Sequence, residues 1–158
     1  MLLAGPDLLV PLTNVLFKFR AHKIANSGDI RGNFRQVNIR VEDRAAQHFL
    51  WRGRNRTQEL SVYEMRAMKF CATSSPTTAQ FVKNENSARF RETDPEAHYA
   101  ILHNHYVDDY LDSVSTVDAA IRRANSVMKV HAARGFEIRN WASSSPKVSQ
   151  NTPVIYVL

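Results

Sequence analysis

The sequence contains few of the residues that cross-link or interrupt a fold. Among 158 residues there are a single cysteine, Cys71, five glycines and six prolines. One cysteine excludes an internal disulfide framework and the paired-cysteine pattern of a structural zinc site. Glycine and proline form no tracts, which excludes a collagen-like or largely disordered chain. Apolar runs stop far short of the roughly 20 residues that span a membrane, and residues 1–10 lack the basic start of a secretory signal.

The residues that are present favour one folded domain with a basic surface. Hydrophobic residues make up 44% of the chain, which is enough for one core of ordinary size. We assign this domain to residues 5–145, and residues 146–158 depart from the pattern as a strand or a frayed tail. Lys and Arg number 21 against 15 Asp and Glu, a net charge of +6. That excess favours a polyanionic partner, although a solvated surface also accounts for it.

Apolar periodicity predicts an α+β fold. In the first half we expect a helix over residues 8–19, a strand over 37–41, paired strands over 49–51 and 62–68, and a helix that begins at 74–76. In the second half we expect an exposed connection over 84–95, a hairpin over 105–111, a helix over 117–131 capped by Ser115 and closed at Gly135, and a strand over 136–138. The simplest packing is an antiparallel sheet with helices on one face.

Three aspartates are candidates for a metal site. Asp108 and Asp109 are adjacent on the predicted hairpin turn, and Asp29 lies where a strand is expected to begin, after Ser27-Gly28. Neighbouring carboxylates repel each other and need solvent, a base or a cation, so for Asp108 and Asp109 alone a solvated turn is the simpler explanation. A sheet that seats the Asp29 strand beside the hairpin would gather all three. Magnesium prefers such hard oxygen ligands and is usually completed by substrate phosphates, which points to phosphoryl chemistry.

Four blocks in a fixed order resemble the reverse transcriptases of BEL/Pao long-terminal-repeat retrotransposons. They are Asp29-Ile30 followed by Phe34 and Gln36, residues 70–76 (FCATSSP), Tyr106-Val107-Asp108-Asp109, and residues 135–139 (GFEIR) leading to Trp141. Residues 5–9 (GPDLL) and 49–52 (FLWR) extend the likeness. The resemblance implies the palm and part of the fingers of an RNA-directed DNA polymerase.

The resemblance also implies the roles of individual residues. Asp29 and Asp108 would hold two magnesium ions, with Mn²⁺ as an alternative, and Asp109 and the Ile30 carbonyl would be further ligands. Phe34 would be a steric gate that rejects the ribose 2′-hydroxyl, although a core aromatic is the plainer reading of the residue alone. The remaining residues implied to bind nucleotide are Phe70, Cys71 and Gln36, and those implied to contact the primer or template are Tyr106, Val107, Trp141, Arg52 and Arg54.

The implied partners are deoxynucleoside triphosphates and a DNA primer on an RNA or DNA template. The implied location is intracellular: the cytoplasm, which includes particles of the element, or the nucleus. Cys71 and Asn140 stand where such enzymes usually have Gly and Lys. Relatives also carry more fingers before this region and a thumb and ribonuclease H after it, so we expect weak or no turnover from the isolated chain. The alternative is a noncatalytic nucleic-acid-binding module derived from such an element. A histidine metal site at His98, His103 and His105 is a weaker alternative.

Overall fold

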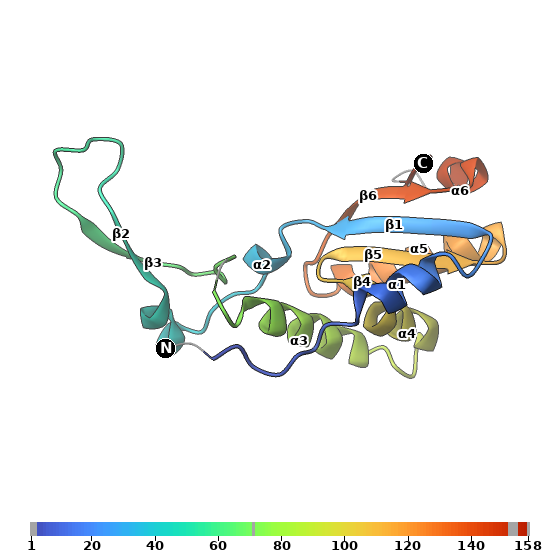
Figure 1. The fold of residues 1–158 in the computed structure, drawn as a ribbon, viewed down its shortest axis with the longest axis horizontal. Helices are drawn as coiled ribbons and strands as arrows, with labels where there is room; N and C mark the ends of the chain where they lie inside the picture. Colours follow the sequence, from blue (N-terminus) through green and yellow to red (C-terminus); the bar gives the residue numbers. More distant parts are fainter. Residues whose placement is uncertain (1–2, 71, 152–154, 158) are drawn as a thin grey trace.

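The computed structural model describes residues 3–70, 72–151 and 155–157 (Figure 1). Its helices are α1 (Leu12–Phe19), α2 (Asn33–Gln36), the 3₁₀ helix η1 (Val41–Gln47), α3 (Ser75–Ala88), α4 (Pro95–His103), α5 (Val117–Ala132) and α6 (Pro146–Asn151). Its strands are β1 (Ile24–Ile30), β2 (His48–Trp51), β3 (Ser61–Glu64), β4 (His105–Tyr106), β5 (Asp109–Val114), β6 (Ile138–Ser143) and β7 (Ile155–Val157). None of the described helices is long and apolar enough to cross a membrane.

The central sheet has the strand order β4-β5-β1-β6-β7. Its first four strands are antiparallel neighbours, which confirms the predicted α+β fold with an antiparallel sheet. The segment that the sequence left open as a strand or a tail contains α6 and then β7, which joins the sheet parallel to β6. Strands β2 and β3 form a separate two-stranded antiparallel sheet.

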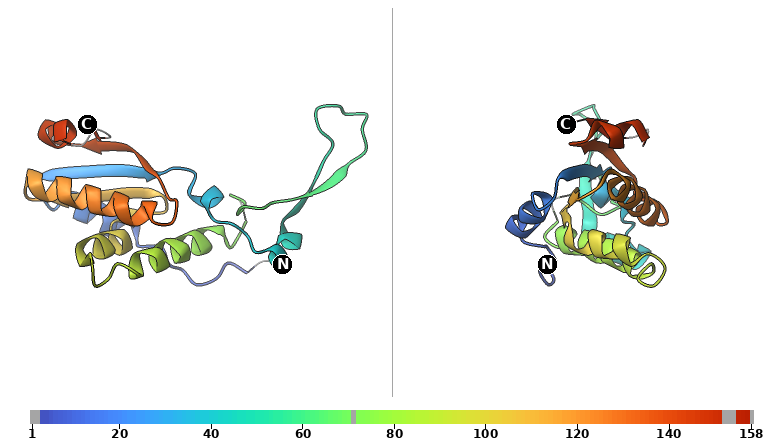
Figure 2. Two further views of the ribbon diagram at one scale, coloured as in Figure 1. Left: turned by 180° about the vertical axis from the view of Figure 1, so that it is seen from behind. Right: turned by 90° about the vertical axis from the view of Figure 1, so that its right-hand side faces the viewer.

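Helices cover both faces of the central sheet. On one face Ile24, Asn26 and Ile30 of β1 are buried, and the Asn26 side-chain amide donates to the Ala120 carbonyl of α5. Figure 2 shows α1 on the opposite side of the sheet from α5. There the Ser113 hydroxyl of β5 donates to the carbonyl of Lys18. The prediction that helices pack on one face is therefore wrong for α1, which contacts β5 from the second face and has one buried residue, Val15.

The region between β1 and β2 does not form the strand expected over residues 37–41. Met68 N donates to the Val37 carbonyl at 2.8 Å and Ile39 N to the Arg66 carbonyl at 2.9 Å. The pairing stops at one isolated bridge, because α2 occupies the residues before it and η1 the residues after it. The paired strands expected over 49–51 and 62–68 are confirmed as β2 and β3, although β3 ends at Glu64.

The connection expected to be exposed over residues 84–95 is instead partly helical and partly buried. Helix α3 continues to Ala88, and Asn86 and Ser87 are at most 3% exposed. The Asn86 side-chain amide donates to the Val130 carbonyl of α5 at 2.7 Å. Because the face of α3 that packs into the core is polar, hydrophobic periodicity misses it. Periodicity also misses α4, whose N-cap Asp94 accepts a hydrogen bond from Ala97 N.

The last predicted helix and strand are present with shifted ends. Helix α5 covers the predicted 117–131, but its N-cap is Thr116, whose hydroxyl accepts from Ala119 N, rather than Ser115. Strand β6 begins at Ile138, two residues after the predicted start. At each boundary a similar nearby residue takes the predicted position: the hydroxyl residue Thr116 in place of Ser115, and apolar Ile138 in place of Phe136.

Helix α3 also carries a buried lysine. Lys83 is 2% exposed, and burial lowers its pKa to about 7. Two buried imidazoles lie nearby, His105 of β4 and His131 of α5, with ring centroids 5.2 Å apart. Burial and then the charge of Lys83 lower the pKa of His131 to about 3 and that of His105 well below its usual value. These side chains are therefore a group of buried bases that acid destabilises.

We predict that Lys83→Met stabilises the fold in a pH-dependent way. Between pH 7 and the ordinary lysine pKa of 10.5 the unfolded chain binds a proton that folded Lys83 does not, so the free energy of unfolding rises with pH. The variant should be more stable than the parent by roughly 2 to 4 kcal/mol at pH 7, and this gain should shrink toward pH 10. Urea unfolding at both pH values measures it. Exposed Lys129→Met is the control, and a gain of equal size at both pH values would contradict the prediction.

Candidate metal centre

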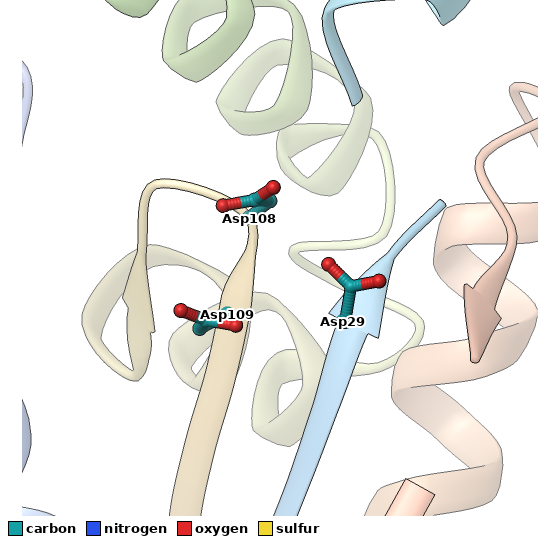
Figure 3. A group of neighbouring side chains, drawn as sticks. All are labelled: Asp29, Asp108 and Asp109. Atoms are coloured by element: carbon teal, nitrogen blue, oxygen red, sulfur yellow. The ribbon is translucent and has the colours of Figure 1, made fainter. Parts of the chain in front are cut away.

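Three carboxylates meet where β1 ends and the β4–β5 hairpin turns. Asp29 of β1 is directly opposite Asp109 of β5 in the antiparallel register, and Asp108 precedes Asp109 in the turn. One oxygen from each carboxylate lies within 4.8 Å of the others. Figure 3 shows the three side chains clustered at the ends of the two strands. Among the described residues this is the only group of three or more His, Cys, Asp or Glu side chains close enough to share an ion.

Backbone contacts fix the position of this cluster. The amide of Ile30 donates to the Asp108 carbonyl at 3.0 Å, which ties the turn to the end of β1. Immediately before Asp29, a Cβ added at Gly28 would lie 2.7 Å from Ile138 Cγ2 and 3.1 Å from Trp141 Cδ2. Glycine is therefore required at position 28 for β1 to approach β6 this closely. The cluster consequently rests on a closely packed part of the core.

The hairpin turn is strained, and a buried glutamine holds it. Val107 has a φ of 55°, at the first central position of a two-residue hairpin loop, where glycine is the usual residue. The Gln80 side-chain amide of α3, 3% exposed, donates to the Val107 carbonyl at 2.9 Å. Gln80 thereby stabilises the turn that carries Asp108. The sequence prediction missed Gln80. The one pattern that could have indicated it is that α3 has little apolar periodicity, so that polar residues in its first turns must supply part of its buried face.

The carboxylates have a higher affinity for protons than isolated aspartates. Burial, together with the negative charge of Asp29, raises the pKa of Asp108. Burial and the charges of Asp108 and Asp29 raise the pKa of Asp109. At the edge of the cluster the Arg139 guanidinium lies 3.4 Å from the Asp29 carboxylate, with both side chains partly exposed. The negative charge is thus incompletely compensated, and a divalent cation would stabilise the ionised carboxylates.

An open cavity of about 380 Å³ lies beside the carboxylates. Its wall includes Phe34, whose ring meets the Phe70 ring edge to face at 5.1 Å. Phe34 is 8% exposed and Phe70 is 72% exposed, so Phe34 is the fixed part of this wall. The lining residues are Asp29, Ile30, Gly32, Asn33, Phe34, Arg35, Phe70, Asp108 and Arg139. The cavity therefore combines carboxylates, an aromatic wall and two guanidinium groups.

Most of the predicted site residues lie at this cavity or in the turn beside it. Tyr106 pairs with Asp109 across the hairpin, and Val107 is in the turn itself. Gln36 does not line the cavity, because its amide donates to the Arg31 carbonyl at 3.2 Å on the exposed side of α2. Cys71 lies outside the described residues. Asn33 and Arg35 line the cavity although the sequence prediction did not include them.

The predicted contact of Trp141 with a primer is wrong. Trp141 is fully buried, with its ring 5.4 Å from the ring of Tyr110. Its physical role is to fill the core beneath the site, next to Gly28. Arg52 and Arg54 lie in the loop between β2 and β3, well away from the carboxylates (Figure 1). Neither of these arginines belongs to the metal centre.

Asn140, which replaces the Lys of the resembling family, has a structural explanation. Its φ is 52°, and the β1–β6 register shifts at this point: between the pairs Asp29–Arg139 and Ser27–Ala142, one β1 residue lies opposite two β6 residues. Asn adopts a left-handed conformation more readily than Lys. The β-bulge directs Arg139 toward Asp29 and still places Trp141 in the core.

The alternative histidine site is wrong in this fold. His98 and His103 belong to α4, and the His98 Nδ1 is 3.1 Å from the Ser87 hydroxyl. His105 is in β4 and is buried. An alternating pair on one strand, on which that hypothesis depended, is therefore not present, because a helix ends between the two positions.

The donor set fits a hard divalent cation. Three carboxylates converge, and the cavity beside two of them is open to solvent, so phosphate or water oxygens have room to complete an octahedral shell. A comparison with models of known protein families found no match, and a comparison with curated proteins found none either.

We predict that Gln80→Leu weakens metal binding without touching a carboxylate. Without its amide the Val107 carbonyl loses its partner, and the turn that positions Asp108 is held less firmly. A hydrogen bond of this kind contributes about 0.5–1.5 kcal/mol, so Mn²⁺ affinity should fall by about threefold to tenfold. Manganese titration followed by electron paramagnetic resonance measures this affinity.

Asn86→Leu is a matched control for Gln80→Leu. Asn86 is buried on the same helix as Gln80, and its side-chain amide donates a similar hydrogen bond to the Val130 carbonyl of α5, away from the turn. Thermal unfolding should show a comparable loss of stability in both variants. Equal loss of Mn²⁺ affinity in both would mean that Gln80 acts only on the stability of the fold.

Proposed function

We propose that this chain is the palm, with part of the fingers, of a BEL/Pao-type reverse transcriptase, an RNA-directed DNA polymerase that extends a primer 3′-hydroxyl. The observation that carries the proposal is the meeting of Asp29, Asp108 and Asp109, which come from two separate sequence blocks. Those blocks belong to the family pattern, and the carboxylates lie next to a cavity of nucleotide size. The positive net charge agrees with a polyanionic substrate.

The carboxylates are the proposed ligands of two magnesium ions. Asp29 and Asp108 hold them, Asp109 is auxiliary, and the Ile30 carbonyl lies at the same cavity. When bound, two such ions lower the pKa of an attacking hydroxyl and stabilise the leaving phosphate oxygens. The chain itself positions the carboxylates. The hydrogen bond from the Ile30 amide to the Asp108 carbonyl and the one from the Gln80 side chain to the Val107 carbonyl hold the turn next to the end of β1.

The aromatic wall and the arginines are the proposed nucleotide contacts. Phe34 is fixed by burial and by Phe70, so its ring suits exclusion of a ribose 2′-hydroxyl by direct clash. Arg35 and Arg139 line the same cavity and would offset triphosphate charge. A guanidinium does not release its proton at neutral pH, so Arg139 acts electrostatically rather than as a general acid.

The proposed partners are a DNA primer on an RNA or DNA template and deoxynucleoside triphosphates, within the cell. The competing function is a noncatalytic nucleic-acid-binding module, which would bind a template without extending a primer. The acidic cluster favours the polymerase, since unneutralised carboxylates repel phosphates and have no use in a simple binding surface.

We predict that Asp108→Asn abolishes magnesium-dependent primer extension. Loss of one ligand removes several kcal/mol of transition-state stabilisation, so extension should fall by more than about 100-fold. The assay uses this chain and also a complete polymerase of the family in which residues 5–145 replace the corresponding segment. Exposed Asp118→Asn is the charge-matched control. Template binding with no extension by the parent chimera would support the noncatalytic module instead.

We predict that Phe34→Val relaxes sugar discrimination. Removal of the ring opens space for a 2′-hydroxyl, and a change of this size in a pocket is worth about 1–3 kcal/mol, a factor of about 10 or more. Competition between ribonucleotides and deoxynucleotides in the chimera measures the selectivity ratio. The ratio should not change in Phe17→Val, at a 75% exposed position on α1. An unchanged ratio in Phe34→Val would assign Phe34 to the core alone.

A further inference from the structure

Strands β2 and β3 and the loop between them, residues 48–64, form an arm that extends away from the central sheet (Figure 1). Every residue of both strands is exposed. The large apolar side chains and their exposed fractions are Phe49 37%, Leu50 60%, Trp51 53%, Leu60 48%, Val62 64% and Tyr63 49%. A two-stranded sheet with apolar residues exposed on both faces is marginally stable and marks an interaction surface.

The end of the arm is basic and has a defined shape. Three arginines lie in the loop, at positions 52, 54 and 56. The loop is ordered by its own hydrogen bonds: the Arg52 guanidinium donates to the Arg56 carbonyl at 3.0 Å, and Asn55 Oδ1 accepts from the Thr57 amide and hydroxyl. A concavity of about 490 Å³ is lined here by Leu50, Trp51, Arg52, Gly53, Arg54, Arg56 and Leu60.

Within the described part of the chain the arginines of this tip have no ion pair, and the loop, with three Arg and one carboxylate, Glu59, keeps a net charge of 3 − 1 = +2. No carboxylate there lies within 4.0 Å of the guanidinium groups of Arg52, Arg54 or Arg56. Glu64, at the base of the arm, pairs with Arg44 instead. The tip therefore presents guanidinium groups beside an exposed indole. Arginine next to an exposed aromatic ring is the combination that binds phosphates and stacks on an unpaired base.

We propose that the β2–β3 arm binds single-stranded nucleic acid, with Arg52, Arg54 and Arg56 at successive phosphates and one base stacked on Trp51 in the concavity. A duplex fits less well, because its bases are already stacked on each other and do not reach the indole face. That the bound strand is the unpaired template ahead of the primer rests on the proposed function, whereas the binding itself does not.

The first test measures affinity for a fluorescein-labelled 15-nucleotide oligo(dT) by fluorescence anisotropy, using the whole chain. The triple variant Arg52→Gln, Arg54→Gln, Arg56→Gln should bind at least tenfold more weakly in 0.1 M salt. Its plot of log affinity against log salt should be shallower by about 2, since each phosphate contact on a single strand contributes about 0.7. Replacing the same three arginines with Lys should retain most of the affinity.

The matched control is Arg89→Gln, Arg91→Gln, Arg134→Gln, three exposed arginines outside the arm. It removes the same net charge, so a general electrostatic effect would weaken both triple variants equally. Equal weakening would overturn the proposal.

The second test uses tryptophan fluorescence. The chain has two tryptophans, of which Trp51 is 53% exposed and Trp141 is fully buried, so quenching by the oligonucleotide reports Trp51. Trp51→Phe should abolish the quenching, and Trp51→Ala should weaken binding by about fivefold or more. A blunt DNA duplex should compete poorly.

Two further outcomes separate the alternatives. Shielding of Trp51 that depends on protein concentration, without oligonucleotide, would identify the arm as a surface for a second copy of the chain and overturn the proposal. The binding tests contain no divalent cation, primer or nucleotide, and exposed Asp118→Asn, outside both the arm and the acidic cluster, should leave oligonucleotide binding and quenching unchanged. Failure of the polymerase proposal and failure of the arm proposal therefore give different results.

Discussion

The antiparallel pairing of β1 with β5 determines where the chemistry of this protein can lie. It puts Asp29 directly opposite Asp109, and the Ile30 amide then fixes the Asp108 carbonyl. Each carboxylate alone would be an ordinary exposed acid. In this register their negative charges accumulate, and burial with mutual repulsion raises the pKa of Asp108 and Asp109. The same pairing that builds the sheet therefore gathers three carboxylates whose mutual repulsion a divalent cation would relieve.

The surrounding core supports this cluster through polar as well as apolar contacts. Gln80 holds the strained turn from one side, and Gly28 allows β6 to pack closely beneath Asp29. Helix α3 supplies a polar buried face to reach the turn, including Lys83, which is costly to bury. The polar buried face of α3 therefore makes the fold less stable than an apolar face would. This cost falls in the part of the molecule that positions the carboxylates.

The sequence predicts the elements with strong local signals and misses those that depend on tertiary partners. The helix now seen as α5, the β4–β5 hairpin and the paired strands of the arm follow from periodicity and turn residues. The gathering of the three aspartates was expected only if the sheet seated the Asp29 strand beside the hairpin, and that strand ends just after Asp29 rather than beginning there. Helix α4 and the buried face of α3 could not be predicted, because polar side chains there are paired with Val130 and His98 across the fold. The resemblance implied a primer contact for Trp141, and no local pattern reveals its burial, because that burial depends on the register of β6.

The bulge at Asn140 has a consequence for how β6 tolerates changes in length. In a regular strand, residues three apart point to opposite sides, yet Ile138 and Trp141 are both buried because one extra residue separates them. Deleting that residue would leave Ile138 and Trp141 two apart on the buried side, with Arg139 still on the other side. Straightening the bulge at the present length would instead turn the indole outward, or else carry Arg139 inward, away from Asp29. At the present length of β6, the left-handed backbone at residue 140 therefore decides whether hydrophobic packing and the charge beside the acids can exist together.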